Sequence, residues 1–303
     1  MSKKPVFSVV VPIFKESDII ESFYLELSKV MDSLGEPYEI IFSDDQTDVD
    51  TVRSVKRICD KDKRVILLSL SRNFGHQVAL SAGIDHAQGD AVIMLDGDFQ
   101  HPPQVILQLV DRWKEGYDIA YTIRKDVAGE RILKKLSSRW FYKLMDNISD
   151  VDMGYNCADF RLISRKVVDA FMQLHEKERF IRGLFSWMGF RKIGIPFKGD
   201  KRKGGKSKYS LRKLFKFAIN GVLSFSDFPL KIITVIGIMV AFAGFIYITA
   251  IIISYFYGEA SRFPGWASIL GSVLLFSGVQ IIMLGIIGEY LGKTFTEVKN
   301  RPL

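Results

Sequence analysis

The stretch DAVIMLDGDFQHPP, residues 90–103, decides the fold and raises the first question about the chain. A short apolar run leads to two carboxylates, Asp96 and Asp98, which one glycine separates, and a Gln, a His and two prolines follow. An apolar run of this length between polar residues predicts a buried β-strand. Because like charges repel, two acids at the end of such a strand indicate that a positive group lies between them.

Segments on both sides of this stretch alternate between strand-like and helix-like patterns. Helical spacing occurs at 18–34, near 51–60 and near 75–88, and the strand-like runs are FSVVVPIF (7–14), YEIIFS (38–43), RVILLSL (64–70), DAVIMLDGD (90–98), YDIAYT (117–122), DFRLIS (159–164) and RKIGIPF (191–197). This alternation predicts an α/β domain whose mostly parallel sheet is covered by helices on both faces. Ligands bind such sheets beyond the carboxyl ends of the strands. Four acids fall there, namely Asp44, Asp45, Asp96 and Asp98.

The apolar content of the chain is concentrated near its C-terminus. The 303 residues are 48% hydrophobic and have a mean hydropathy of +0.12, which is high for a wholly soluble protein. Residues 232–257 and 266–288 carry no charged side chain. Each run exceeds the roughly 20 residues that span a bilayer core. We therefore expect an integral membrane protein with two transmembrane helices, at about 232–257 and 266–288, joined as a tight hairpin.

Charge around the two apolar runs predicts their orientation and a three-part organisation. Lys and Arg crowd the segment before the first run and follow the second, so the soluble part and both termini are expected to be cytoplasmic. The parts are a soluble domain at 1–209, an amphipathic helix at 210–229 and the hairpin with its tail at 230–303. The amphipathic helix has one broad apolar face beside basic residues, which suits the membrane interface. A helix packed on the soluble domain is the alternative.

Several function classes are disfavoured by missing patterns. No GxGxxG follows the first strand, which argues against a nicotinamide dehydrogenase, and GGKSKYS (204–210) lacks the glycine and the strand of a Walker loop. The two cysteines, Cys59 and Cys157, have no CxxC spacing and read as buried thiols in a reducing compartment. The net charge of +8 suits phosphorylated substrates or an anionic membrane, and we expect no nucleic acid partner.

The spacing of the two acids predicts a divalent metal site. Residues i and i+2 of an extended chain point to the same side, so Asp96 and Asp98 face one site, and Gln100 offers a further oxygen. Oxygen ligands suit Mg²⁺ or Mn²⁺, which commonly bridge carboxylates to substrate phosphates. His101 is expected to be a turn residue rather than a ligand. A solvated acidic turn is the alternative for the whole stretch.

Six motifs in order resemble one family. VVVPIFKESDII, SDDQTDVDT and LDGDFQHPP resemble motifs of GT-A (Rossmann-like) glycosyltransferases of family 2. LSRNFGHQVALSAGIDHAQGD, DFRLISR and RKGGKSKYSLRKL are similar to its polyprenyl-phosphate branch, which includes dolichyl-phosphate mannose synthases and bacterial undecaprenyl-phosphate glucosyltransferases. The chain departs from the usual residues at four positions, with Phe14 for Tyr, Lys15 for Asn, Gln46 for Gly and Val49 for Asp.

The resemblance implies roles for individual residues. Pro12, Phe14, Glu16 and Asp44 match positions that hold the nucleotide, with Asp45 beside them, and Asp96, Asp98 and Gln100 match the metal and diphosphate site. Arg124, Arg131 and Arg202 match basic residues near the phosphates, and each is a solvated surface cation in the alternative reading. Asp159 matches an acid close to the acceptor, or is a structural partner of Arg161. The basic segment 201–210, with Arg202, Lys206, Ser207 and Lys208, is expected to close over the site.

These roles predict a metal-dependent, inverting glycosyltransferase. The expected partners are a nucleotide-sugar donor, a polyprenyl-phosphate acceptor and the lipid bilayer, and a homo-oligomer stays open. UDP-glucose is the first choice of donor, with aminoarabinose or mannose transfer as alternatives. A processive polysaccharide synthase is disfavoured because the chain has no QxxRW. A catalytically silent scaffold that binds nucleotide sugars is the remaining alternative.

Overall fold

A computed structural model describes residues 4–124, 157–174, 176, 179–197, 228–256 and 265–299. It divides the chain into two compact units, which are described separately below. Most of the predicted interfacial helix and all of the basic segment 201–210 lie outside the described residues. The expected boundaries at 209 and 230 therefore stay predictions.

The first unit is built on a mixed sheet of seven described strands in the order β3-β2-β1-β4-β6-β5-β7. Strand β6 runs antiparallel to its neighbours β4 and β5, and the other described pairs are parallel. The strands are β1 (Phe7–Ile13), β2 (Tyr38–Asp44), β3 (Val65–Ser69), β4 (Ala91–Met94), β5 (Ile119–Arg124), β6 (Cys157–Ser164) and β7 (Lys192–Phe197). The predicted α/β sheet is confirmed.

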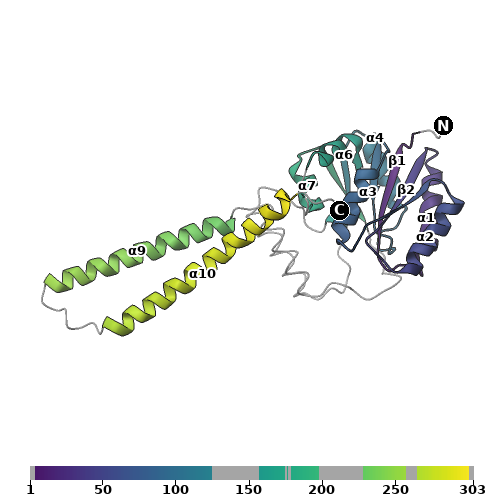
Figure 1. The fold of residues 1–303 in the computed structure, drawn as a ribbon. Coiled ribbons are helices and arrows are strands. Elements are labelled where there is room, and N and C mark those ends of the chain that lie inside the picture. Colours follow the sequence, from purple (N-terminus) through teal and green to yellow (C-terminus); the bar gives the residue numbers. More distant parts are fainter. Residues whose placement is uncertain are drawn as a thin grey trace, which may run out of the picture. The chain divides into compact units, whose positions relative to one another are not determined.

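Helices flank both faces of this sheet (Figure 1). They are α1 (Ile20–Ser33), α2 (Val49–Lys61), α3 (His76–His86), α4 (Val105–Lys114), α6 (Arg165–Met172) and α7 (Ile181–Trp187). Phe7, Val9 and Val11 of β1 belong to the same core cluster as apolar residues of α1, α2 and α4. Val10 points the other way, because a Cβ on Gly83 of α3 would meet its side chain at 2.3 Å. Alternation along β1 thus buries both of its faces.

The register defines two edges of the sheet, which we name by the ends of the parallel strands. Ile13 pairs with Asp44, so β1 and β2 end at the same level, which we call the carboxyl edge. Their other ends, near Phe7 and Tyr38, form the amino edge. Strand β4 ends at Met94, four residues earlier than the strand predicted through Asp98. A turn that includes Gly97 follows, so Asp96 and Asp98 lie in a loop and not on extended chain.

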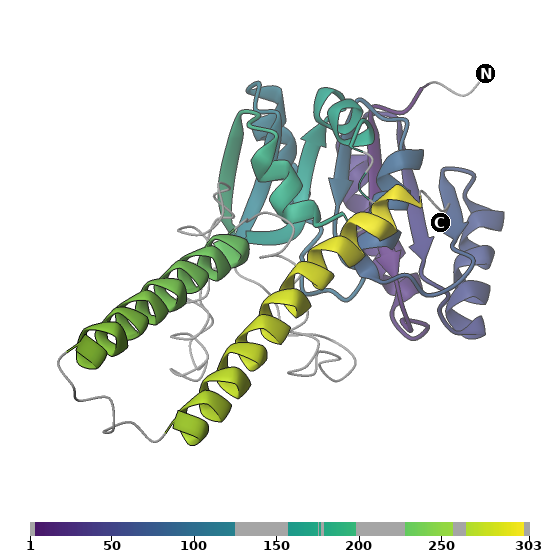
Figure 2. The same ribbon diagram turned by 60° about the vertical axis from the view of Figure 1, so that its left-hand side comes forward.

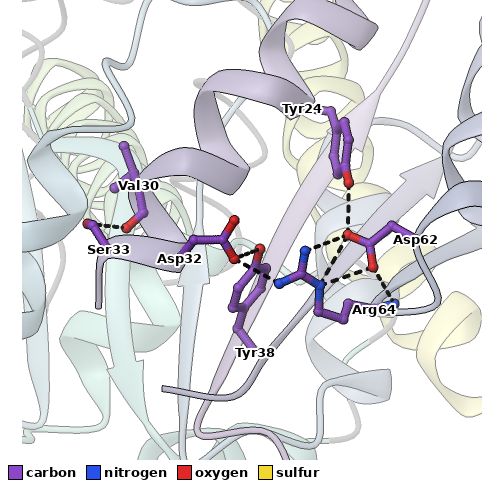
Figure 3. Close-up of polar contacts among 7 residues, drawn as sticks. All are labelled: Tyr24, Val30, Asp32, Ser33, Tyr38, Asp62 and Arg64. Carbon is purple, nitrogen blue, oxygen red and sulfur yellow. Dashed lines mark hydrogen bonds and ion pairs between the residues drawn. The ribbon is translucent and has the colours of Figure 1, made fainter. Parts of the chain in front are cut away.

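A closed polar network lies at the amino edge (Figure 3), and we call it the amino-edge cluster: Tyr24, Asp32, Tyr38, Asp62 and Arg64. Arg64 Nη1 donates to Asp32 at 2.8 Å, and its Nε and Nη2 donate to Asp62 at 3.0 and 2.9 Å. Both tyrosine hydroxyls donate to these acids at 2.8 Å. Burial raises the pKa of Tyr38, and its bond to Asp32 acts in the same direction. The network joins α1, α2, β2 and β3.

The second unit consists of two long apolar helices, α9 (Phe228–Phe256) and α10 (Gly265–Val298) (Figure 2). Both are long and apolar enough to cross a membrane, over Pro229–Tyr247 and Leu275–Val298, and the side chains of these windows are not buried inside the protein. The two predicted apolar helices are confirmed. The second continues beyond residue 288, where a span was predicted to end, through a more polar last part that contains Glu289 and Lys293.

Candidate active site

Asp96 lies between two histidines at the carboxyl edge. His76, the first residue of α3, places its Nε2 2.8 Å from Asp96 Oδ1. His101 places its Nδ1 3.5 Å from the other oxygen and is buried against the rings of Phe160 and Phe197. His101 lies in a bend shortly before α4, consistent with the predicted turn position, and its imidazole is also buried in the site. A positive group was expected beside Asp96 and Asp98 because the two carboxylates repel each other. Protonated His76 is one such group.

Electrostatics keep the His76–Asp96 pair charged. Burial disfavours the imidazolium of His76, but the charge of Asp96 and the bond to it raise the pKa of His76 to about 9. Burial also opposes ionisation of Asp96, and the charge of His76 outweighs it and lowers the pKa of Asp96. At neutral pH the pair is therefore an ion pair about a third exposed to solvent.

Asp98 is held by the loop that follows it. The backbone N–H of Gln100 donates to Asp98 Oδ1 at 3.0 Å, and the side-chain amide of Gln100 donates to Oδ2 at 2.9 Å. Between them Phe99 adopts left-handed backbone with φ 61°. A Cβ at Gly97 would stand 3.0 Å from Glu16 Oε2, so glycine allows the loop after β1 to approach this turn. Glu16 therefore lies close to the turn in which Asp98 and Gln100 contact each other, and the roles of these residues stay predictions.

The loops after β1 and β2 are tied to each other. Lys15 N donates to Thr47 Oγ1 at 2.5 Å, and Thr47 N donates to Asp44 Oδ1 at 2.7 Å. Lys15 and Gln46 both have left-handed backbone, with φ of 58° and 51°. These are the two positions where the related motifs usually carry Asn and Gly, the residues that adopt this conformation most readily.

The carboxylate of Asp45 binds the backbone immediately before α3. Its carboxylate accepts from Phe74 N at 2.6 Å and from Gly75 N at 2.9 Å. Burial raises the pKa of Asp45, against the two N–H donors that lower it. Both carboxylate oxygens therefore serve the backbone that positions His76. The predicted substrate-binding role of Asp45 stays untested, and a supporting role is what its contacts provide.

Asp159 forms a bidentate ion pair that the sequence did not predict. Arg182 of α7 places Nε 2.6 Å from Asp159 Oδ1 and Nη2 2.9 Å from Oδ2. Arg161, the structural partner in the alternative reading of Asp159, lies farther away, with Nη2 at 3.8 Å. Burial opposes ionisation of Asp159, but Arg182 holds the pKa of its carboxyl well below the usual range. Asp159 and Arg182 are 23 positions apart in the sequence, which leaves no local signal for this pair.

The remaining predicted residues are placed only in part. Pro12 is buried within β1, and Phe14 lies under the ammonium of Lys15, which is 5.4 Å from the ring centre. Arg124 is the last residue of β5, paired with Phe197, and only its backbone is described. The other predicted residues, Arg131, Arg202, Lys206, Ser207 and Lys208, lie outside the described residues.

The donor set at the carboxyl edge fits a hard divalent cation. Asp96 and Asp98 supply carboxylates and Gln100 an amide, which are oxygen ligands of the kind that Mg²⁺ and Mn²⁺ take. Within the described residues, no three His, Cys, Asp or Glu side chains are grouped to hold a metal ion by themselves. His76 and Gln100 hold the carboxylates in place here.

Comparison with known proteins agrees with this geometry. Residues 8–171 match Glycosyl transferase family 2, and residues 228–294 match the GtrB C-terminal hairpin. The SfII prophage-derived bactoprenol glucosyl transferase of Shigella flexneri is 39% identical over 97% of this chain and 95% of its own length. The prophage bactoprenol glucosyl transferase homolog of Escherichia coli K12 is 38% identical over 97% of this chain and 96% of its own length.

A solved structure shares the fold over most of the chain. Mannosyltransferase PcManGT from Pyrobaculum calidifontis, in complex with GDP-Man and Mn²⁺, aligns with a TM-score of 0.50 at 15% identity and covers 96% of this chain and 88% of its own. The family match extends over more than half of the sequence and includes Asp44, Asp96, Asp98 and Asp159. The chain therefore belongs to glycosyl transferase family 2 and is a glycosyltransferase.

Proposed function

We propose that the protein transfers glucose from UDP-glucose to a polyprenyl phosphate, such as undecaprenyl phosphate, at the cytoplasmic face of a membrane. The observation that carries this proposal is the combination of an acidic carboxyl edge with two apolar helices in one chain. Bactoprenol glucosyl transferases resemble the chain along nearly its full length, which supports the choice of sugar and of lipid.

The nucleotide belongs on the β1–β2 side of the site. Glu16 and Asp44 stand in tied loops at the carboxyl ends of these strands, where ligands of open α/β sheets bind. Acceptor oxygens of this kind suit the hydroxyls of a ribose and the N–H groups of a base. Phe14 adds a ring beside them. The left-handed backbone at Lys15 and Gln46 supports the proposal, since strain of this kind gathers at ligand sites.

The diphosphate belongs beside Asp96, Asp98 and Gln100. A bound Mg²⁺ or Mn²⁺ would neutralise the charge of the departing nucleoside diphosphate. His76 and the Asp98–Gln100 contacts hold the two carboxylates at the edge of the sheet before substrate arrives. Such pre-organisation lowers the cost of ordering the site when the donor binds. Arg124, Arg131 and Arg202 stay proposed as further phosphate contacts.

The acceptor phosphate needs little chemical activation. A phosphate monoester is an anion at neutral pH, so its oxygen attacks the anomeric carbon without a strong general base. Orientation and charge stabilisation then dominate the rate. We propose a single displacement that inverts the anomeric centre. The apolar helices α9 and α10 would keep the enzyme in the membrane that holds the lipid, with both termini cytoplasmic because basic residues flank the hairpin.

A donor panel tests the proposal. Membranes that contain the protein are incubated with undecaprenyl phosphate, Mn²⁺ and labelled UDP-glucose, UDP-linked aminoarabinose or GDP-mannose, and membranes with Asp98→Asn serve as the control. Label is expected in the lipid fraction from UDP-glucose, and only with the unmodified protein. Label in the lipid fraction from another donor would mean that the protein transfers the sugar of that donor and not glucose. UDP-glucose binding without any lipid product would favour a silent scaffold.

A further inference from the structure

In the pair formed by Asp159 and Arg182, the guanidinium of Arg182 is more exposed to solvent than the carboxylate of Asp159. Both oxygens of Asp159 are taken by the Nε and Nη2 groups of Arg182, at 2.6 and 2.9 Å. Arg161 lies behind Asp159 and over the ring of Phe185. The exposed fractions of the three side chains rise from 5% for Arg161 through 11% for Asp159 to 28% for Arg182. The guanidinium of Arg182 is therefore what a ligand meets first.

The charge of this group favours an anion. Nitrogen atoms of two arginines, Arg161 and Arg182, lie 3.8 and 2.6 Å from the carboxylate of Asp159, so the group carries two cations beside one acid. A guanidinium that is already oriented by a carboxylate presents its fork with little further loss of freedom, which suits a phosphate oxygen.

Strand order places this group on the far side of the site from the nucleotide. In the sheet, β4 with its following acids stands between β1 and β6. Glu16 and Asp44 follow β1 and β2, whereas Asp159 belongs to β6 and Arg182 to α7. In a single displacement the attacking group approaches opposite the leaving group. With the nucleotide on the β1–β2 side and its diphosphate beside the acids after β4, the attacking phosphate belongs toward β6 and α7.

We propose that Arg182 binds the phosphate monoester of the lipid acceptor and that Asp159 is the positioning residue that orients its guanidinium. This inference rests on the proposed function and assigns a residue to its acceptor. Asp159 is then no proton acceptor in the reaction, because its two oxygens are held by Arg182 and the attacking phosphate is already an anion. The same chemistry could recognise the diphosphate of the donor, so the test separates the two sources.

The test measures the KM for undecaprenyl phosphate and the KM for the nucleotide sugar in the full-length protein, reconstituted in nanodiscs. Arg182→Gln is expected to raise the acceptor KM about tenfold to hundredfold, the value of a charge-assisted phosphate contact. Arg182→Lys, which keeps the charge without the fork, should restore part of the loss. The donor KM and the binding of Mn²⁺ with UDP, measured by calorimetry, should stay as in the parent.

Arg179→Gln is the matched control. Arg179 also forms an arginine–aspartate pair, with Nη1 3.0 Å from Asp85, and stacks over Phe171. It stands three positions before Arg182 and pairs with the end of α3 farthest from His76. Its loss should lower the thermal unfolding midpoint about as much as loss of Arg182 does, with the acceptor KM unchanged. Equal changes in KM for the two variants would mean a structural role and overturn the proposal.

The variant Asp159→Asn distinguishes a positioning role of Asp159 from a role as proton acceptor. A positioning role predicts a raised acceptor KM with most of kcat kept at saturating acceptor, whereas loss of a general base would lower kcat at every acceptor concentration. A rise confined to the donor KM would assign Arg182 to the diphosphate and refute the acceptor assignment. Failure of the unmodified protein to use undecaprenyl phosphate with any nucleotide sugar would instead refute the proposed function itself.

Discussion

The turns at the two edges of the sheet reach left-handed backbone with different residues. At the amino edge the described turns use glycine, at Gly35, Gly116 and Gly189, with φ between 69° and 89°. At the carboxyl edge Lys15, Gln46 and Phe99 adopt the same conformation with φ between 51° and 61°, alongside Gly75. A side chain in this region costs about 1–2 kcal/mol per residue. The molecule thus avoids strain at one edge and keeps it at the edge that carries the site.

The two edges also use the same arginine–aspartate pair in different ways. In the amino-edge cluster one guanidinium lies between two acids that also accept from tyrosine hydroxyls, so the network closes on itself (Figure 3). At the carboxyl edge Arg182 and Arg161 surround one acid, and Arg182 remains partly exposed. The first arrangement joins elements that are neighbours in sequence. The second keeps positive charge beside Asp96, where an anionic substrate would bind.

The largest expected effect is a loss of transfer activity on substitution at the carboxyl edge, with no such loss at the amino edge. Asp98→Asn removes a charge that the proposed metal site needs, and transfer should fall by at least about a hundredfold, as when a group that stabilises transition-state charge is lost. Its unfolding midpoint should stay close to that of the parent. Asp62→Asn at the amino edge is the matched control, with normal transfer and a lower unfolding midpoint. Full activity of Asp98→Asn would show that transfer does not depend on this carboxylate of the carboxyl edge.

Stability should respond at the amino edge. Arg64→Ala leaves Asp32 and Asp62 facing each other without their shared donor, so the free energy of unfolding should fall by about 1–2 kcal/mol, a value reduced for solvent exposure. Transfer per folded molecule should be unchanged. The measurement is thermal unfolding together with the transfer assay. A loss of transfer with an unchanged midpoint would contradict a purely structural cluster.

The edges should also differ in pH dependence. The pKa of His76 is raised from 6.5 to about 9, so its ion pair stabilises the folded state fully below about pH 6.5 and stops doing so as the pH rises through about 9. Arg64 holds the pKa of Asp62 below its usual value, against its burial, so that contribution is lost only in acid. The unfolding midpoint is measured in EDTA from the acid range, below about pH 4, up to about pH 10.

His76→Asn should remove the decline between pH 6.5 and pH 9 and leave the acid limb as in the parent. The change amounts to no more than about 1 kcal/mol, because a third of the imidazole is exposed and solvent screens the pair. Identical alkaline curves for the parent and the variant would show that His76 is neutral at these pH values.

The smallest effect concerns strain. Lys15→Gly should raise the free energy of unfolding by about 0.5 kcal/mol, since glycine relieves the left-handed conformation but gains freedom in the unfolded chain. Lys63→Gly is the control, because Lys63 is exposed in a turn at the amino edge without left-handed backbone and should lose stability instead. Equal losses for both lysines would show that Lys15 is unstrained.

Local patterns predicted most of the fold. Apolar runs located all seven described strands, and charge-free length located α9 and α10, because burial and membrane insertion both leave contiguous signals. The end of β4 was misplaced, since the alternation of apolar residue, acid and glycine after Met94 reads equally well as strand or turn. The departures at Lys15 and Gln46 were visible in the sequence, but their left-handed backbone was not.

The site was predictable only where its residues share a motif. Asp96, Asp98 and Gln100 lie within five positions, so spacing alone connects them. His76 of α3 contacts Asp96, and Arg182 of α7 contacts Asp159. Both contacts depend on the tertiary fold and not on spacing in the sequence. The alternative reading of Asp159 paired it with Arg161, its near neighbour in the sequence. The tertiary fold supplied a shorter contact.

The proposed function requires the carboxyl edge to transfer glucose to a polyprenyl phosphate with the help of a divalent ion. The most direct measurement is mass spectrometry of the lipid fraction after purified protein in nanodiscs meets UDP-glucose and undecaprenyl phosphate. We expect a lipid heavier by one hexose, released UDP, no product in EDTA, and recovery with Mn²⁺. An unchanged lipid with UDP-glucose consumed, or full product in excess EDTA, would contradict the account.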